Sequence, residues 1–272
     1  MDGPQRREEL PIAIFTALAW ESAAVRSVLR HVRREQERVW RGVAGTRDVL
    51  VVTGGIGPRR TQQTLDQFRQ RPFSAVWSVG CAGALVPGLA TGQLVLAPEV
   101  CMHERHGETR PSETRLDETS LNRFSVDSQL LAYARAAATK ASVLTAEGSL
   151  YTSPKILFTP EDKAQRGRET GAIAVEMESG VHAAFAAAQG VPFLVLRVIL
   201  DGVDMRLPAV KGLTTPEGDV RAFKAAMHVV THPHHLPALL ALKRSRTIAA
   251  QALARLCHAL FSLMATAPGE PA

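Results

Sequence analysis

The chain has 272 residues, of which 46% are hydrophobic and 21% are charged. This length allows one large domain or two small ones with a sizeable core, and the composition is that of an ordinary soluble globular protein and not of a disordered chain. The formal net charge of +6 could indicate an anionic partner. However, the basic residues are scattered and alternate with acids, as in residues 33–38, which is typical of solvated helix faces, so no nucleic-acid partner is expected.

The three cysteines, Cys81, Cys101 and Cys257, are widely spaced and form no CxxC pair. The spacing indicates neither a disulfide framework nor a zinc site, and we expect no metal and no cofactor. The N-terminal residues are charged and lack the apolar run of a signal peptide. No uninterrupted apolar run reaches the roughly 18 residues of a membrane span. We therefore expect a cytoplasmic protein.

The apolar patterning predicts alternating strands and helices. Short apolar runs predict strands over residues 10–18, 49–53, 75–79, 93–97, 142–146, 173–175 and 193–200. Helical spacing of apolar residues predicts helices over residues 22–30, 58–69, 128–138, 160–168, 177–189, 219–230 and 236–263. Residues 102–123 are nearly all polar and are expected to form a surface excursion. The alternation favours an α/β domain with a mostly parallel sheet.

Three acids, Glu176, Glu178 and Asp201, lie at the edges of two apolar elements. The second element, residues 193–200, is nearly all Val, Ile, Leu and Phe, which is typical of a strand buried on both faces of a parallel sheet. Open α/β sheets bind ligands beyond the carboxyl ends of their strands, so Asp201 is the first candidate for chemistry. Arg197 lies inside this strand and needs an acidic partner, which we expect to be Glu176 or Asp201.

Glycine-rich segments follow three of the predicted strands, at residues 54–57, 80–83 and 201–202. Glycine lets the backbone approach a ligand closely and leaves N–H groups free to face it. Arg60 stands where the dinucleotide-binding pattern GxGxxG needs its last glycine, so a dinucleotide site is not indicated.

Three motifs in this order resemble those of one known superfamily. They are Gly80-Cys-Ala-Gly83, Val175-Glu-Met-Glu-Ser179 and Arg197-Val-Ile-Leu-Asp-Gly-Val-Asp204. Over roughly residues 10–204 the chain resembles the nucleoside phosphorylase and methylthioadenosine–S-adenosylhomocysteine nucleosidase superfamily. The C-terminal third is more loosely similar to a subgroup associated with hopanoid lipid synthesis.

The resemblance implies a three-layer α/β/α fold around a central mixed, mostly parallel sheet. It implies a single domain over residues 1–272, with a flexible tail at about residues 1–9 and a long C-terminal helix at about residues 236–263.

The resemblance also implies roles for individual residues. Asp201 would protonate N7 of a purine leaving group, or donate a hydrogen bond to it. Glu178 would bind the ribose hydroxyls, with Met177 packing against the sugar. Glu21 matches the acid that activates water in the hydrolytic branch. These roles suit the reaction, because cleavage of an N-glycosidic bond builds positive charge on the sugar and negative charge on the base. Glycosidases likewise divide the work between two carboxyl groups.

Further positions would surround the base and the nucleophile. Ala82 and Gly83 would line the base pocket, and Ile156 is the best match in the segment that covers the base. Cys81 stands in place of a Ser that helps to hold the nucleophile in relatives. Leu200 stands in place of the Ser before the catalytic Asp.

Water is favoured over phosphate as the nucleophile. Phosphorylases of this superfamily usually have an Arg where this chain has Ser78, and the acid at Glu21 would repel a phosphate. Arg59 and Arg60 leave the phosphorylase alternative open. A further alternative is a non-catalytic protein that has kept the fold and binds nucleosides or nucleic acid.

The expected substrate is a 5′-substituted adenosine, either methylthioadenosine-like or adenosylhopane-like, and the resemblance implies a homo-oligomer, with a dimer favoured. The C-terminal helix has a basic face that could contact a membrane. His232, His234 and His235 are interrupted by prolines, which favours a loop over a metal site.

Overall fold

The computed structural model describes residues 10–103, 120–207 and 236–266. Within these residues, twelve strands form one mixed sheet, in the order β2-β3-β4-β1-β5-β11-β10-β7-β8, with β12, β6 and β9 branching from β5. The strands are β1 (Ile12–Thr16), β2 (Arg30–Gln36), β3 (Val39–Ala44), β4 (Arg47–Thr53), β5 (Ala75–Ala84), β6 (Leu94–Leu96), β7 (Glu99–His103), β8 (Leu121–Ser125), β9 (Thr145–Glu147), β10 (Leu150–Thr152), β11 (Ala174–Glu176) and β12 (Phe193–Asp201).

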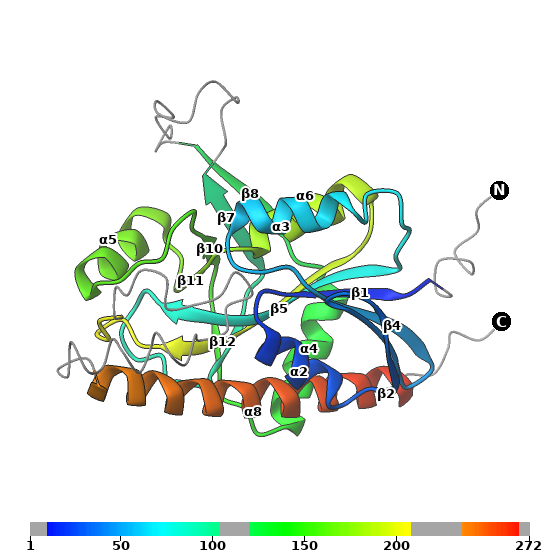
Figure 1. Cartoon of the computed structure of the whole chain (residues 1–272). Coiled ribbons are helices and arrows are strands. Elements are labelled where there is room, and N and C mark those ends of the chain that lie inside the picture. The colour runs from blue at the N-terminus through cyan, green and yellow to red at the C-terminus, as the bar shows by residue number, and fades with distance from the viewer. Residues whose placement is uncertain (1–9, 104–119, 208–235, 267–272) are drawn as a thin grey trace.

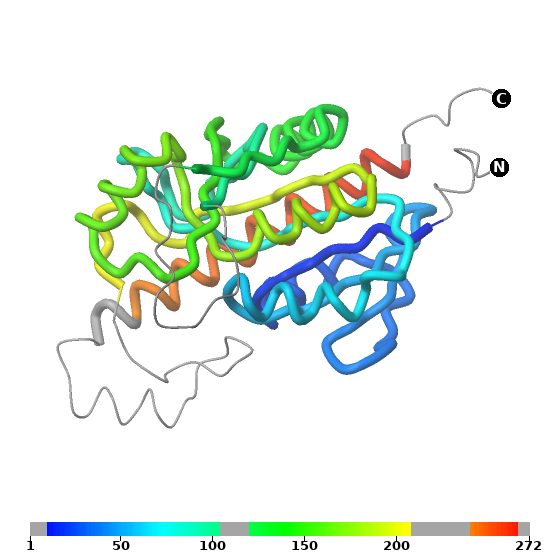
Figure 2. Tube along the Cα trace, turned by 90° about the horizontal axis from the view of Figure 1, so that it is seen from above, coloured from blue at the N-terminus to red at the C-terminus, as the bar shows by residue number. Residues whose placement is uncertain are grey.

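Helices cover both faces of the sheet, which confirms the predicted three-layer α/β/α fold (Figure 1). The helices are α2 (Ala19–Arg26), α3 (Pro58–Asp66), α4 (Ser128–Lys140), α5 (Pro160–Thr170), α6 (Ser179–Gln189) and α8 (Leu236–Thr266). Helices α3 and α6 pack together on one face, whereas α2 and α4 pack with α8 on the other. Figure 2 shows α8 running along the length of the molecule.

The centre of the sheet is parallel and buried on both faces. Strand β5 pairs in parallel with β1 on one edge and with β12 on the other. The indole of Trp77 in β5 stacks on Phe261 of α8, with 5.8 Å between the ring centroids. On the opposite face, the ring of Phe15 in β1 stacks on His182 of α6 at 5.1 Å. Burial on both faces explains why these strands are almost continuously apolar, and each fully buried Val, Leu or Ile contributes about 1.5–3 kcal/mol.

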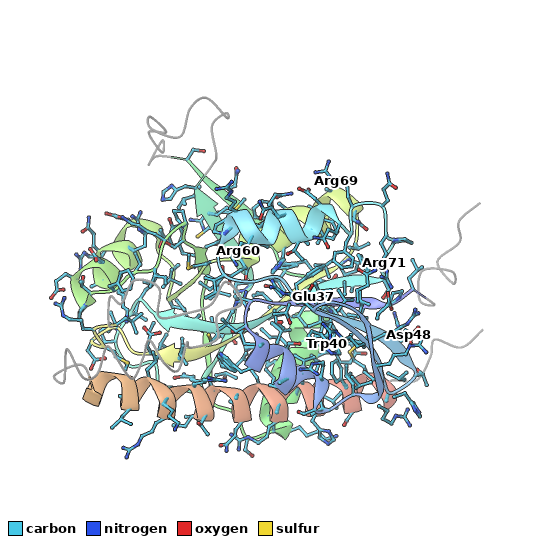
Figure 3. The ribbon with its side chains drawn as sticks, in the orientation of Figure 1. Glu37, Trp40, Asp48, Arg60, Arg69 and Arg71 are labelled. Atoms are coloured by element: carbon cyan, nitrogen blue, oxygen red, sulfur yellow. The ribbon has the colours of Figure 1, made fainter. Side chains whose placement is uncertain are left out.

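The charged segment at residues 33–38 is not a helix face. Strand β2 is the exposed edge strand of the sheet and pairs antiparallel with β3. Its Glu35 pairs with residues outside the strand: Arg71 Nη1, labelled in Figure 3, lies 2.7 Å from one carboxylate oxygen of Glu35, and Arg41 Nη1 of β3 lies 3.9 Å from the other. An exposed edge strand is protected from aggregation by charge. Alternating charges occur equally on an exposed strand and an exposed helix, and this ambiguity explains the wrong prediction.

The polar segment at residues 102–123 begins and ends in strands that the sequence reading missed. Strands β7 and β8 pair antiparallel and include Met102, His103 and residues 121–123. Residues 104–119 lie outside the described residues, as do the tail at residues 1–9, the predicted helix 219–230 and the three histidines at positions 232, 234 and 235.

Residues 80–83 were predicted to follow a strand that ends at residue 79, but they belong to the strand itself. Strand β5 continues through them to Ala84 and stays paired with β12. The two glycines leave room for side chains to lie close to the strand, and the chain does not reverse direction at them. A Cβ on Gly80 would collide with Arg197 and lie 2.7 Å from Glu21 Oε1, and a Cβ on Gly83 would lie 3.0 Å from Asp201 Oδ2.

Candidate active site

The site lies where one edge of β5 changes partner. Residues 75–78 of β5 pair with β1, and Gly83 and Ala84 pair with β11. Residues 79–82 lie between these two ladders and, within the described sheet, pair with neither strand. The predicted acids come from three other elements: Glu21 lies in the first turn of α2, Glu176 and Glu178 lie at and just after the end of β11, and Asp201 ends β12. Strand order therefore brings together residues that are more than 150 positions apart.

Glu21 lies in the first turn of α2 and is 1% exposed. Its Oε2 accepts hydrogen bonds from the backbone N–H groups of Ala17 and Leu18, at 3.0 and 2.9 Å, and its Oε1 accepts one from Cys81 at 2.9 Å. Burial raises the pKa of Glu21, whereas the charge of Arg197 and these hydrogen bonds lower it. The pKa is raised on balance, so the carboxyl group is set up to take a proton.

Cys81 lies between two of the acids. Its thiol interacts with Glu21, and burial together with the charges of Glu21 and Asp201 raises the pKa of Cys81 well above its ordinary value. The thiol is therefore neutral and a weak hydrogen-bond donor, so a water molecule competes well with it for the Glu21 carboxylate.

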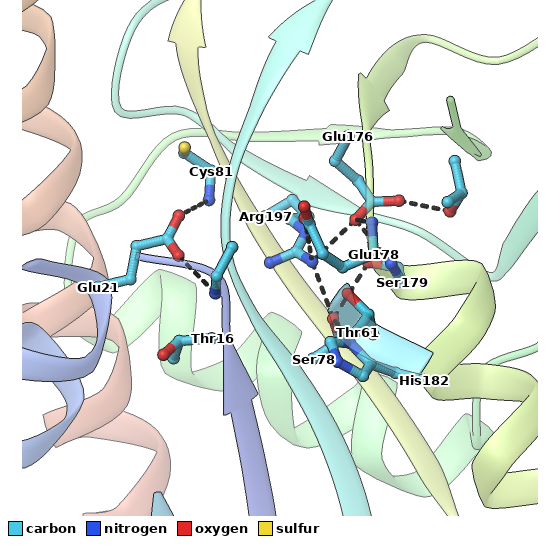
Figure 4. Close-up of polar contacts among 12 residues, drawn as sticks. Thr16, Glu21, Thr61, Ser78, Cys81, Glu176, Glu178, Ser179, His182 and Arg197 are labelled. Carbon is cyan, nitrogen blue, oxygen red and sulfur yellow. Dashed lines mark hydrogen bonds and ion pairs between the residues drawn. The ribbon is translucent and has the colours of Figure 1, made fainter. Parts of the chain in front are cut away.

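A buried network behind the gap holds the acids in place (Figure 4). Arg197 Nη2 donates hydrogen bonds to Glu176 Oε2 and to Ser78 Oγ, both at 2.8 Å. Ser78 Oγ also lies 2.8 Å from Nδ1 of His182. Burial, and secondarily Arg197, lowers the pKa of His182 well below its ordinary value, so the imidazole is neutral. The predicted ion pair of Arg197 is thus formed with Glu176, on the scaffold side of the site.

Glu176 organises the start of α6. Its Oε2 accepts hydrogen bonds from the backbone N–H groups of Glu178 and Ser179, at 2.9 and 2.7 Å, and its Oε1 accepts one from the Thr152 hydroxyl. Together with Arg197, these contacts fill the acceptor positions of the carboxylate. These contacts give Glu176 a scaffold role.

Glu178 joins the glycine-rich turn at residues 54–57 to the site. Its Oε1 accepts a hydrogen bond of 2.8 Å from the Gly57 N–H, and its Oε2 lies 3.8 Å from Arg197 Nη2. Burial and the neighbouring charge of Glu176 raise the pKa of Glu178 to about 8. Gly57 has φ of 92°, a conformation that favours glycine, and the half-buried Met177 lies beside it.

Asp201 is the last residue of β12 and is 4% exposed. The register of β12 against β5 shifts between Ile199 and Asp201, which places Asp201 beside Gly83. Its Oδ2 accepts a hydrogen bond of 2.5 Å from Lys163 Nζ. Burial raises the pKa of Asp201, and Lys163 lowers it; the pKa is raised on balance. A carboxyl group with a raised pKa suits the role of a general acid near neutral pH.

Lys163 was not recognised in the sequence as part of the site. It lies on α5 and is 1% exposed. The signal that could have revealed it is the spacing of Lys163, Gly167 and Thr170, which places all three on the buried face of α5. A lysine on such a face needs a carboxylate partner.

Three further residues were named from the sequence around the base and the catalytic acid. The Ala82 methyl group belongs to the main hydrophobic core. Ile156 is 43% exposed and follows β10. Leu200 is half-buried, and its carbonyl accepts a hydrogen bond from Thr91. Their roles remain predictions. No group of three or more potential metal ligands occurs among the His, Cys, Asp and Glu residues that the structure describes.

The family model of the phosphorylase superfamily matches residues 11–230, and the chain belongs to this superfamily. A 5′-methylthioadenosine/S-adenosylhomocysteine nucleosidase from Mycobacterium bovis is 26% identical over 216 residues, which cover 70% of this chain and 85% of that protein.

Two solved structures from Helicobacter pylori have the same fold. A futalosine hydrolase aligns with a TM-score of 0.68 at 20% identity, covering 94% of this chain and 98% of that one. A 5′-methylthioadenosine/S-adenosylhomocysteine nucleosidase, in complex with a substituted pyrrolidin-3-ol, aligns with a TM-score of 0.68 at 20% identity, covering 94% of this chain and 99% of that one. The fold predicted from the sequence is confirmed. The named activities of these relatives agree with the predicted class of enzyme, an N-ribosyl hydrolase.

Proposed function

We propose that this protein is a purine nucleosidase that hydrolyses the N-glycosidic bond of a 5′-substituted adenosine and releases adenine. The observation that carries the proposal is the position of two buried acids beside the two glycines of β5, Glu21 at Gly80 and Asp201 at Gly83. The nucleosidase relatives support the same activity.

Glu21 and Asp201 have different roles in the proposed reaction. Glu21 takes a proton from water while the water oxygen bonds to C1′ of the ribose. The electron pair of the C1′–N9 bond moves onto the purine, and Asp201 gives its proton to N7. Glu178 accepts hydrogen bonds from the ribose hydroxyls, which orients the sugar. General acid–base steps of this kind typically contribute about 10²–10⁴-fold each.

The charges around the gap favour water over phosphate. Ser78 stands where an anion-binding Arg is expected in a phosphorylase, and it is already bound to Arg197 and His182. The guanidinium of Arg197 is engaged by Glu176 and lies near Glu178, so it offers little charge to an anion. Glu21 adds negative charge at the same place.

We expect adenine release to be independent of phosphate. Purified protein would be assayed with methylthioadenosine, with and without added inorganic phosphate, and the sugar product would be identified by mass spectrometry. Free methylthioribose at an unchanged rate supports hydrolysis. A strict requirement for phosphate, with a sugar 1-phosphate as product, would instead show a phosphorylase. Absence of turnover together with salt-dependent RNA binding would favour the non-catalytic alternative.

Gly83→Ala is expected to reduce turnover, by less than the roughly 10²-fold that a displacement of about 1 Å costs, because Asp201 must move by a few tenths of an ångström. The added methyl would lie 3.0 Å from Asp201 Oδ2 and displace this side chain from the leaving base. The measurement is kcat for adenine release, with circular dichroism to confirm that the variant is folded. Full activity in a folded variant would contradict the placement of Asp201.

The finer features of the proposal concern partners. We propose a cytoplasmic homodimer and a 5′ group that is methylthio-like or a larger apolar group such as that of adenosylhopane. The stretch Leu240–Ala265 of α8 is long and apolar enough to cross a membrane, but 44% of it is buried within the protein. The exposed side of α8 includes Lys243, Arg244 and Arg255, which supports a peripheral contact with an anionic membrane.

A further inference from the structure

Lys163 is a buried cation whose side-chain nitrogen is surrounded by hydrogen-bond acceptors. Helix α5 begins after Thr159, whose hydroxyl accepts a hydrogen bond from the Asp162 N–H at 3.1 Å, and this cap sets the orientation of the first turn. Lys163 follows in that turn and points to the protein interior, where it is 1% exposed. Lysine is almost never buried to this extent without a charged partner.

The ammonium group of Lys163 has three N–H groups, and each has an acceptor. Nζ donates to Asp201 Oδ2 at 2.5 Å, to the Gly202 carbonyl at 2.8 Å and to the Met205 carbonyl at 2.8 Å. The turn is closed further by a hydrogen bond of 3.2 Å from the Met205 N–H to the Gly202 carbonyl. Lys163 thus binds both the candidate acid and the backbone turn that follows it.

Other charged and titratable groups near Asp201 are few among the residues that the structure describes. Strand β5 contributes the neutral Cys81 thiol, and the turn contributes the exposed Asp204. The side chains of α8 that are buried in the core are apolar or, at Cys257, a thiol whose pKa is raised to about 12. Lys163 is the cation whose charge acts on Asp201.

We propose that Lys163 is a positioning residue for Asp201, a role that rests on the proposed nucleosidase function. By occupying Oδ2, it leaves Oδ1 as the oxygen that faces the leaving base. As the C1′–N9 bond breaks, the proton moves from Asp201 to N7 of the purine, and Asp201 becomes a carboxylate. The ammonium group of Lys163 stabilises the negative charge that forms, which is an interaction stronger in the transition state than in the ground state.

The ion pair of Lys163 and Asp201 affects how turnover depends on pH. Burial raises the pKa of Asp201 and Lys163 lowers it. Asp201 acts in its protonated form, so turnover falls as the pH rises through this pKa. Without the cation the pKa is higher, and Asp201 is a weaker acid that stays protonated to higher pH. Loss of Lys163 should therefore lower the maximal turnover and move the alkaline limb of the kcat profile toward higher pH.

The test compares Lys163→Met, Lys163→Arg and Lys140→Met, the last being the same change at an exposed position on α4. We expect Lys163→Met to reduce kcat by about 10–100-fold with a smaller change in KM, and to move the alkaline limb upward by about one pH unit or more. Lys163→Arg should return the limb toward its wild-type position, and Lys140→Met should match wild type throughout.

A second measurement separates this proposal from the nucleosidase proposal. The Asp201 carboxyl carbon would be titrated by ¹³C NMR, with its resonance assigned by its loss in Asp201→Asn. Absence of adenine release by the wild type would contradict the proposed function, and the titration would still test the pair. A carboxyl titration that is unchanged in folded Lys163→Met, or an unmoved alkaline limb, would overturn the role of Lys163.

Discussion

Asp201→Asn is expected to reduce adenine release by about 10²–10⁴-fold while the protein stays folded. Asparagine has the shape of aspartic acid but no acidic proton for N7. Its amide oxygen still accepts the hydrogen bond from Lys163, which lies 2.5 Å from Asp201 Oδ2, so the turn after β12 is preserved. The measurement is the initial rate of adenine release.

The matched control is Asp204→Asn, the same change at an exposed position three residues later. We expect its turnover to be close to wild type. Thermal unfolding followed by circular dichroism would show that both variants are folded. An Asp201→Asn variant with wild-type turnover would remove Asp201 from the reaction and leave the two-acid mechanism without its acid.

Arg197→Met is expected to lower the free energy of unfolding by about 3–5 kcal/mol, the cost typical of leaving a buried charge without its partner. Arg197 is 1% exposed and binds Glu176 and Ser78. Its removal leaves the Glu176 carboxylate without its cation, beside the carboxyl group of Glu178 in a desolvated site. Urea-induced unfolding followed by circular dichroism gives the free energy directly.

Arg206→Met is the control for this change. Arg206 and its partner Glu161 are mostly exposed, with side-chain exposures of 65% and 75%, and their ion pair is 3.4 Å long. Exposed pairs of this kind contribute about 0–1 kcal/mol, so little loss is expected. If Arg197→Met were as stable as Arg206→Met, the buried network would not be what holds the acids in place.

The candidate site residues could be proposed from the sequence because they lie in short motifs at the ends of apolar elements. The strand at residues 193–200 was recognised from its continuous apolar run, and β12 confirms it with one more residue, Asp201. An ion pair of Arg197 was predicted because burying an unpaired guanidinium is costly, and the structure shows Glu176 as its partner. These inferences need only local pattern and general energetics.

Errors arose where one local pattern is compatible with two structures. The charged residues of β2 were interpreted as a helix face, because alternating charge is the same on both exposed elements. Gly80 and Gly83 were interpreted as a segment that follows a strand, because glycine occurs both where a strand ends and where side chains pack closely against it. Strand β5 instead passes through them, and the space left by the absent Cβ atoms is filled by Glu21, Arg197 and Asp201.

The α/β class and the superfamily follow from the sequence alone, because periodicity, strand ends and motif spacing are local properties. Tertiary structure decided what each acid contacts. Asp201 accepts a hydrogen bond from Lys163, 38 positions away in the sequence, and Glu178 accepts one from Gly57, 121 positions away. Such contacts depend on strand order and on which helix face is buried. The resulting desolvation and pairing set the pKa of each carboxyl group, and no local pattern contains that information.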